Sequence, residues 1–204
     1  ADSIYNFKTN YKSSNKLITS AKKPIIAILP GSRKQEIKKI LNTVIETVEY
    51  FTDYQFIVAG APNIELSYYT SIIKNKKIKV IENKTYELLS VSHAAIVTSG
   101  TATLETALFK VPQIVCYKSS YFSFIIAKLI VNIKYISLVN LIMDQEIVKE
   151  LIQQDCNKDK ITKELKKILD LNHRKSLKVK YDELTSVLGN FGTSKRIALD
   201  IITK

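Results

Sequence analysis

Two short segments combine small residues, hydroxyls and a charged side chain at the start of a helical pattern. They are Leu29-Pro30-Gly31-Ser32-Arg33 and Ser99-Gly100-Thr101-Ala102-Thr103-Leu104-Glu105, and each follows an apolar, β-branched run. A small-residue turn between a strand and a helix leaves free backbone N–H groups that point at one spot, where the helix dipole favours negative charge. Two such turns in one domain predict a phosphate-bearing ligand held between two helix ends, and a sugar nucleotide fits that description.

The first turn contains three residues suited to a phosphate site. Gly31 permits a tight turn and a close approach of the backbone. Ser32 is suited to be the N-cap of the following helix, with Glu36 completing a capping box. Arg33 presents a planar fork of donors that matches phosphate oxygens. The alternative interpretation is a plain strand-to-helix turn with a capped helix and a solvated arginine.

The second turn brings hydroxyls and free N–H groups to one point through Ser99, Gly100 and Thr101. Glu105 follows one turn into the helix, where its carboxylate could accept hydrogen bonds from ribose hydroxyls. The alternative is that Glu105 is favoured there only by the helix dipole.

Two polar residues further along the chain could also reach a ligand. Asn140 lies in an apolar run, which predicts a specific partner, either a ligand or backbone carbonyl groups. Gln154 ends a predicted helix and could reach the same crevice or be a solvated helix end.

The elements that must position these turns alternate regularly between strand and helix. Strands are predicted at 25–29, 55–59, 77–81, 94–97 and 113–116, and helices at 34–51, 64–74, 85–91 and 101–109. This βαβαβαβαβ order predicts an α/β fold, a Rossmann-like parallel sheet with helices on both faces. In such sheets ligands bind beyond the carboxyl ends of the strands, where both turns lie. Beyond residue 116 only helices are predicted, at 121–133, 144–154, 158–169, 174–187 and 194–202.

Length and composition indicate one domain with a helical extension. The chain has 204 residues, 46% of them hydrophobic, which is enough for a core. Residues 1–23 are polar and are predicted to be a linker, 24–156 a nucleotide-binding domain and 157–204 C-terminal helices. The longest apolar stretch, 121–133, is too short to span a bilayer, which needs ~20 residues. It is interpreted as a buried helix or as part of a lipid-facing surface. The start of the sequence has no signal-peptide pattern, and the chain is expected to be soluble as written.

The net charge of +12 favours an anionic partner, such as nucleic acid, a membrane surface or an anionic substrate. The alternative is a lysine-rich composition that spreads over solvated faces. No nucleic-acid-binding motif is present. Cys116 and Cys156 lack metal-ligand spacing and are expected to be buried thiols in a reducing cytosol. His93 and His173 are isolated, so neither a metal site nor a Ser-His-Asp triad is predicted.

Taken together, these segments resemble lipid-A-disaccharide synthases, the glycosyltransferases of family 19. The matching pieces run in family order over about residues 24 to 156. They are Leu29–Arg33 with Glu36-Ile37, Ser99–Glu105, Val115–Lys118, Phe122–Phe124, Ala127-Lys128, Lys134–Leu138, Asn140-Leu141, Glu150–Gln153 and Asp155-Cys156.

The resemblance implies a GT-B enzyme with two Rossmann-like halves and a cleft between them. Such an enzyme is an inverting hexosyltransferase that moves 2,3-diacylglucosamine from UDP-2,3-diacylglucosamine onto 2,3-diacylglucosamine 1-phosphate (lipid X). The products are lipid A disaccharide 1-phosphate and UDP, and neither a metal nor a cofactor is implied. This chain would be the C-terminal, donor-binding half and inactive alone. Residues 1–23 would be the interdomain crossover, and the N-terminal half would supply the acceptor pocket and the general base.

The resemblance also implies roles for individual residues. Ser32 and Arg33 would approach the diphosphate, and Arg33 would stabilise the leaving UDP. Ser99, Gly100 and Thr101 would supply backbone and hydroxyl donors from the turn, and Glu105 would hold the ribose. Asn140 and Gln153 would lie near the donor cleft. Val139 stands where family members commonly have proline, a difference that would loosen the loop before Asn140.

The implied setting is the cytoplasmic face of the inner membrane, where the enzyme would be a peripheral protein on an anionic surface. No nucleic-acid partner is implied, and a homo-oligomer is left open. The other interpretations are another GT-B UDP-sugar transferase or epimerase, a nucleotide-binding regulatory module without catalysis, and a basic nucleic-acid-binding protein.

Overall fold

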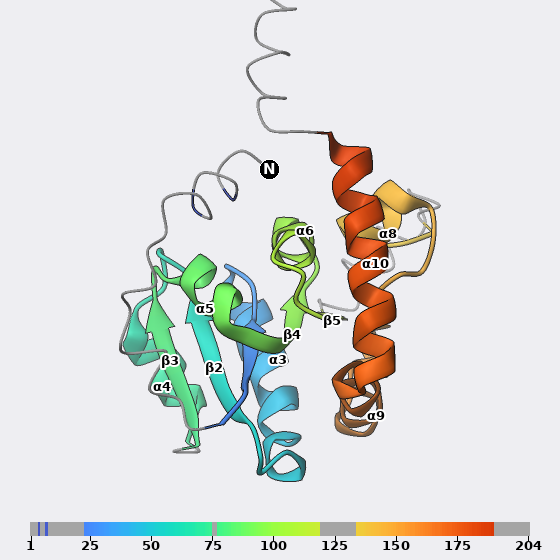
Figure 1. Cartoon of the computed structure of the whole chain (residues 1–204). Helices are drawn as coiled ribbons and strands as arrows, with labels where there is room; N and C mark the ends of the chain where they lie inside the picture. Colours follow the sequence, from blue (N-terminus) through green and yellow to red (C-terminus); the bar gives the residue numbers. More distant parts are fainter. Residues whose placement is uncertain (1–3, 5–6, 8–22, 75–76, 119–133, 190–204) are drawn as a thin grey trace, which may run out of the picture.

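The computed structural model describes residues 4, 7, 23–74, 77–118 and 134–189, and its centre is a six-stranded parallel sheet (Figure 1). The strand order is β3-β2-β1-β4-β5-β6. The strands are β1 (Ile25–Leu29), β2 (Gln55–Gly60), β3 (Ile78–Glu82), β4 (Ser92–Thr98), β5 (Gln113–Tyr117) and β6 (Lys149–Ile152). The predicted α/β class with a Rossmann-like sheet is confirmed.

Helices and two short 3-10 turns connect the strands. The helices are α3 (Lys34–Ile45), α4 (Leu66–Ile72), α5 (Thr85–Val91), α6 (Thr101–Leu108), α8 (Leu138–Met143), α9 (Lys158–Leu169) and α10 (Leu171–Leu188). The 3-10 turns are η1 (Val48–Tyr50) and η2 (Gln153–Asp155). In the part of the chain that the structure describes, no helix is both long enough and apolar enough to cross a membrane.

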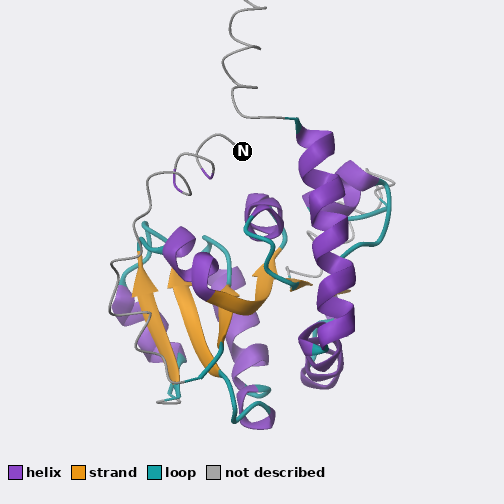
Figure 2. Cartoon of the chain, in the orientation of Figure 1, coloured by secondary structure: helices purple, strands orange, loops and turns teal. Residues whose placement is uncertain are grey.

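Helices cover both faces of the sheet (Figure 2). The central strands need this cover because they are apolar on both sides. All five residues of β1 are buried, which is typical of a parallel strand between two helical layers. Alternate residues of β1 point to opposite faces: Ile26 and Ile28 pack with α3, α4 and α9, whereas Ala27 and Leu29 pack with α5 and α6.

A third apolar cluster joins the helices beside the β5 end of the sheet. It contains Ala107 of α6, Val139 of α8, and Tyr181 and Leu184 of α10, all of which are completely buried. This cluster fixes α8 against α6, the helix that begins at the second glycine turn. Figure 1 shows α10 as the long red helix next to α8.

Two of the predicted helices differ from the structure by more than two residues at one end, whereas most other predicted elements match within two residues. The helix predicted at 34–51 ends at Ile45, and the chain continues into η1. The hydroxyl of Thr47 donates to the carbonyl of Val44 at 2.7 Å. In a continuing α-helix this carbonyl would accept from the backbone N–H four residues later, so the side chain competes with the helix. The helix predicted at 174–187 begins earlier, at Leu171, because the carboxylate of Asp170 caps it by accepting from the N–H groups of residues 172 and 173.

The helix predicted at 144–154 is wrong, and so is the expectation that strands end after residue 116. Asp144 ends the unpredicted helix α8 in a left-handed conformation with φ of 43°. Lys149–Ile152 then forms β6, which pairs in parallel with β5 in the register Cys116↔Leu151. The apolar positions 147, 148, 151 and 152 also fit a helix, which is why local spacing misassigns this strand. The helices predicted at 121–133 and 194–202, and most of the predicted linker, lie outside the described residues.

Candidate functional site

A pocket lies at the carboxyl ends of the central strands. The chain first builds β1, β2 and β3 in one direction and then crosses back to place β4 on the other side of β1. Parallel sheets bind ligands at such a switch point because the two neighbouring connections leave in opposite directions. The pocket there measures about 560 Å³, within the usual range of ligand sites. Its wall includes both glycine turns, together with Ala59–Pro62, Thr85, Thr98 and Tyr117.

Gly31 makes the first turn possible. Its φ is +97°, and a Cβ at this position would lie 3.1 Å from Oε2 of Glu36 and 3.5 Å from Cγ2 of Thr98. A larger residue would therefore combine backbone strain with crowding in the pocket wall. The predicted need for glycine at this turn is confirmed.

The predicted capping box at the first turn is wrong. Helix α3 begins one residue later than that motif requires, so its N-cap is Arg33 and no side chain caps it. Glu36 pairs instead with Arg33, Nη1 to Oε1, at 3.0 Å. Because no side chain caps the first turn of α3, its backbone N–H groups remain available to an anion at the pocket.

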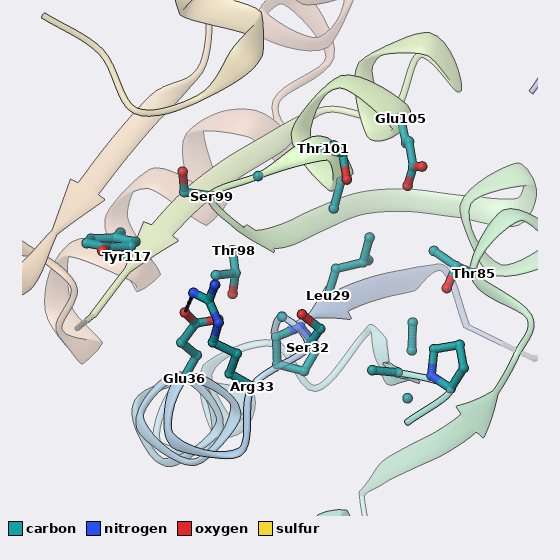
Figure 3. Close-up of a pocket in the computed structure, with 18 residues that line it drawn as sticks. Leu29, Ser32, Arg33, Glu36, Thr85, Thr98, Ser99, Thr101, Glu105 and Tyr117 are labelled. Carbon is teal, nitrogen blue, oxygen red and sulfur yellow. Dashed lines mark hydrogen bonds and ion pairs between the residues drawn. The ribbon is translucent and has the colours of Figure 1, made fainter. Parts of the chain in front are cut away.

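Arg33 is the most exposed charge at the pocket. Its side chain is 81% exposed, whereas that of its partner Glu36 is 22% exposed. Figure 3 shows this pair on one side of the pocket, opposite Thr101 and Glu105 on the other side. Ser32 is also exposed and lines the pocket. The structure therefore brings together the predicted residues of both turns.

The second turn depends on Gly100, the N-cap of α6. Its φ of +141° with ψ of −163° is a conformation that only glycine adopts without strain. Among the residues that the structure describes, none has an atom within 4 Å of a Cβ placed here, and the backbone of Gly100 lines the pocket. No side chain caps α6, and Thr101 at its first position is exposed. The hydroxyl of Ser99 is committed elsewhere, because it donates to the carbonyl of Ile136 at 2.7 Å.

Glu105 faces the pocket and has a partner that sequence analysis missed. The hydroxyl of Tyr86, on α5, donates to Oε1 of Glu105 at 3.1 Å. Desolvation, and then the charge of Glu105, raise the pKa of Tyr86 to about 12, so the hydroxyl stays protonated at neutral pH. Tyr86 therefore orients the Glu105 carboxylate, which lines the pocket. An aromatic residue far away in the sequence gives no local signal of this pairing.

Thr98 is a second pocket residue without a sequence signal. It ends β4 between the two turns and is buried, and within the described part of the chain its Oγ1 has no hydrogen-bond partner.

Asn140 does not line the pocket. Its amide is buried, with Nδ2 donating to the carbonyl of Val148 at 2.8 Å and Oδ1 accepting from the N–H groups of Ile147 and Val148 at 2.8 and 3.0 Å. Of the two interpretations open at the sequence level, the structure shows backbone partners. Gln153 is buried in η2 with φ of 51° and is also absent from the pocket wall. Gln154 is exposed in η2, which replaces the expected helix end.

Both cysteines are free and buried, as predicted. Over the described ranges, no group of three or more His, Cys, Asp or Glu side chains is placed to hold a metal ion.

The fold and the position of the pocket define the class: a Rossmann-like domain of the GT-B type, shared by glycosyltransferases and UDP-sugar epimerases. The S. aureus MnaA–UDP structure superposes with a TM-score of 0.60 at 18% identity, covering 96% of this chain and 50% of that one. The Neisseria meningitidis UDP-GlcNAc 2-epimerase bound to UDP-GlcNAc gives a TM-score of 0.57 at 14% identity, over 99% of this chain and 50% of that one. The spinosyn rhamnosyltransferase SpnG gives 0.58 at 13% identity, over 88% and 46%.

Within that class, the chain belongs to the lipid-A-disaccharide synthetase family, whose sequence model matches residues 1–199. It is 33% identical to the lipid-A-disaccharide synthase of Persephonella marina over 97% of this chain and 55% of that protein. The enzymes of Anaeromyxobacter dehalogenans and Coxiella burnetii are 32% and 34% identical, over 89% and 86% of this chain. The chain spans about half the length of these curated relatives.

Proposed function

We propose that this chain is the donor-binding half of an inverting lipid-A-disaccharide synthase. The donor would be UDP-2,3-diacylglucosamine, the acceptor 2,3-diacylglucosamine 1-phosphate, and the products lipid A disaccharide 1-phosphate and UDP. The observation that carries the proposal is the pocket between two uncapped helix starts, each preceded by a glycine in a left-handed or extended positive-φ conformation. Such helix starts bind phosphate through backbone N–H groups without any metal.

In this proposal each wall of the pocket binds a different part of UDP. The two helix starts and Arg33 receive the diphosphate, whose negative charge grows as the bond to the sugar breaks. Donors already in place for that charge stabilise the transition state more than the ground state. Glu105, oriented by Tyr86, accepts hydrogen bonds from the ribose hydroxyls. The general base and the acceptor pocket come from the other half of the enzyme, so this half is inactive alone.

The positive charge of the chain fits substrates that reside in an anionic bilayer. Each basic residue close to such a surface contributes about 1 kcal/mol of attraction. We therefore place the enzyme at the cytoplasmic face of the inner membrane as a peripheral protein. Cosedimentation with liposomes should increase with the anionic lipid content and decrease with salt, and binding that ignores both would contradict this part of the proposal.

Calorimetric titration tests whether separate parts of the pocket bind the diphosphate and the ribose. UDP, uridine and inorganic pyrophosphate are the separate probes. Glu105→Ala should weaken UDP and uridine but not pyrophosphate, because it removes only the ribose contact. The matched control is Glu49→Ala, which removes an exposed carboxylate of η1, before β2 and away from the pocket wall. A Glu105→Ala chain that binds UDP like the wild type would return Glu105 to a structural role.

The activity itself needs the full-length protein. Supplied with both lipid substrates, it should release UDP and form the disaccharide. UDP binding without consumption of any UDP-sugar would instead favour a regulatory nucleotide-binding module, and epimerisation without an acceptor would favour a UDP-sugar epimerase.

A further inference from the structure

A network of hydrogen bonds joins the second glycine turn to the edge strand β6. From it we infer that Glu150 is a positioning residue for the donor site: it holds the 136–138 segment that in turn holds the turn at Gly100. The inference rests on the proposed function, because it assigns Glu150 a role in binding the diphosphate that the second turn is proposed to receive.

The carboxylate of Glu150 gathers donors from one short segment. Oε2 accepts from the N–H of Ile136 at 2.9 Å. Oε1 accepts from the N–H and the hydroxyl of Ser137 at 2.9 and 2.8 Å, and from Nδ2 of Asn140 at 2.8 Å. Across the described ranges, the ion pairs do not include Glu150. Its charge is therefore stabilised by neutral donors, and hydrogen bonds to an ionised acceptor are the stronger kind.

The 136–138 segment, which Glu150 holds, is hydrogen-bonded to the second turn on both sides of Gly100. On one side, the carbonyl of Ile136 accepts from the hydroxyl of Ser99 at 2.7 Å. On the other side, the N–H of Leu138 donates to Oγ1 of Thr103 at 3.3 Å, and the Thr103 hydroxyl donates to the carbonyl of Gly100 at 2.8 Å.

Packing alone does not fix this turn. Among the described residues, nothing lies within 4 Å of the Cβ position of Gly100, and a glycine has access to many backbone conformations, so neither side-chain contacts nor a restricted φ at this position hold the turn in place. The hydrogen bonds from the 136–138 segment supply the constraint. The carboxylate of Glu150 accepts from the N–H groups of Ile136 and Ser137 in the same segment. Glu150 therefore holds the turn indirectly, through this segment.

The substitution Glu150→Gln changes this anchor with little change in volume. A carboxylate can accept from all four donors, whereas an amide must turn its NH₂ group toward some of them. If its oxygen keeps the three donors at Oε1, its NH₂ opposes the N–H of Ile136, the residue whose carbonyl holds Ser99. Glu150→Gln therefore removes the hydrogen bond to Ile136, the residue that connects Glu150 to the second turn.

A double-mutant cycle in the 204-residue chain tests the inference with UDP, pyrophosphate and uridine as probes. Glu150→Gln should weaken UDP and pyrophosphate about tenfold, which corresponds to about 1.4 kcal/mol, and leave uridine unchanged. Ser99→Ala should weaken UDP in the same direction. The double variant should bind UDP about as well as Glu150→Gln alone, because both changes interrupt one connection.

Leu165→Ala is the matched control for lost stability. Leu165 is completely buried on α9, in the apolar layer that Ile26 and Ile28 share, and lies outside both the pocket wall and the hydrogen-bond network. It should lower the free energy of unfolding while leaving UDP affinity unchanged at a temperature where all variants are folded. If Glu150→Gln does not fold, Ser137→Ala takes its place. It removes the hydroxyl contact to Glu150 and the side-chain cap of α8, keeps the backbone contact, and should weaken UDP about threefold.

Wild-type UDP affinity in the Glu150 variant, strictly additive losses with Ser99→Ala, or an equal loss in Leu165→Ala would each overturn the inference. A wild-type chain that binds neither UDP nor pyrophosphate would overturn the proposed function instead.

Discussion

Replacing Arg33 by alanine separates the binding role of this residue from any role in the fold. The side chain of Arg33 is 81% exposed, and its ion pair with Glu36 spans a single helical turn. Exposed pairs of this kind contribute only about 0–1 kcal/mol to stability. The free energy of unfolding should therefore change by less than about 1 kcal/mol, so that any larger effect on UDP concerns the ligand.

The expected loss of affinity follows from the same geometry. A hydrogen bond to a charged group contributes about 1.5–3 kcal/mol. In the wild type, Arg33 must first leave Glu36, which subtracts up to about 1 kcal/mol. The net loss is about 0.5–3 kcal/mol, or about 2- to 150-fold in the dissociation constant of UDP. Turnover of the full-length enzyme should fall by about 10²–10³, because in the proposed function the arginine faces charge that develops during the reaction.

Calorimetry with UDP measures this loss, and Lys38→Ala is the control. Lys38 is exposed on the same helix, carries the same charge and does not line the pocket. It should report only the general effect of removing one positive charge. Equal affinities in the two variants, or an Arg33 variant with normal turnover, would refute the assignment of Arg33 to the leaving group.

Three further predictions concern the turn, the network and pH. Gly100→Ala should lower the free energy of unfolding by about 1–3 kcal/mol through backbone strain and also weaken UDP, as measured by denaturation and titration. Asn140→Ala should cost about 1–3 kcal/mol in urea denaturation, because it takes the side-chain partner from the buried N–H of Val148; a loss below about 1 kcal/mol would contradict the network. Burial, and then the charge of Arg174, lower the pKa of His93 below its ordinary 6.5, so the unfolded chain binds the proton more readily. Stability should therefore fall as pH drops through 6.5, and less steeply in His93→Asn; His173 keeps part of the slope.

Five of the six strands were predictable because their signals are local, and so were helices α5 and α9, which have the predicted bounds. An uninterrupted apolar run such as Ile25–Leu29 is typical of a strand buried on both faces. Helix α9 has the predicted bounds, 158–169, since Asn157 caps it through Oδ1 and its apolar residues recur at helical spacing. The two glycine turns were predictable for a similar reason, because small residues between a strand and a helix restrict what the backbone can do.

The remaining features depend on partners that are distant in sequence. Strand β6 forms where β5 offers an edge and where Asn140 binds the N–H groups of Ile147 and Val148, and neither can be seen within 146–153. The orientation of Glu105 depends on Tyr86, nineteen residues earlier. The capping box failed for a smaller reason, a helix start displaced by one residue, which turns Glu36 toward Arg33.

The strand order has a consequence for how the protein acquires its pocket during synthesis. Leu29 of β1 pairs with Val97 of β4, although two other strands, β2 and β3, lie between them in the sequence. One wall of the pocket is therefore synthesised long before the other, and a nascent chain that stops short of Glu105 lacks the wall that begins at α6. Until then the exposed side of β1 is an unpaired edge, of the sort that chaperones or neighbouring polypeptides can engage.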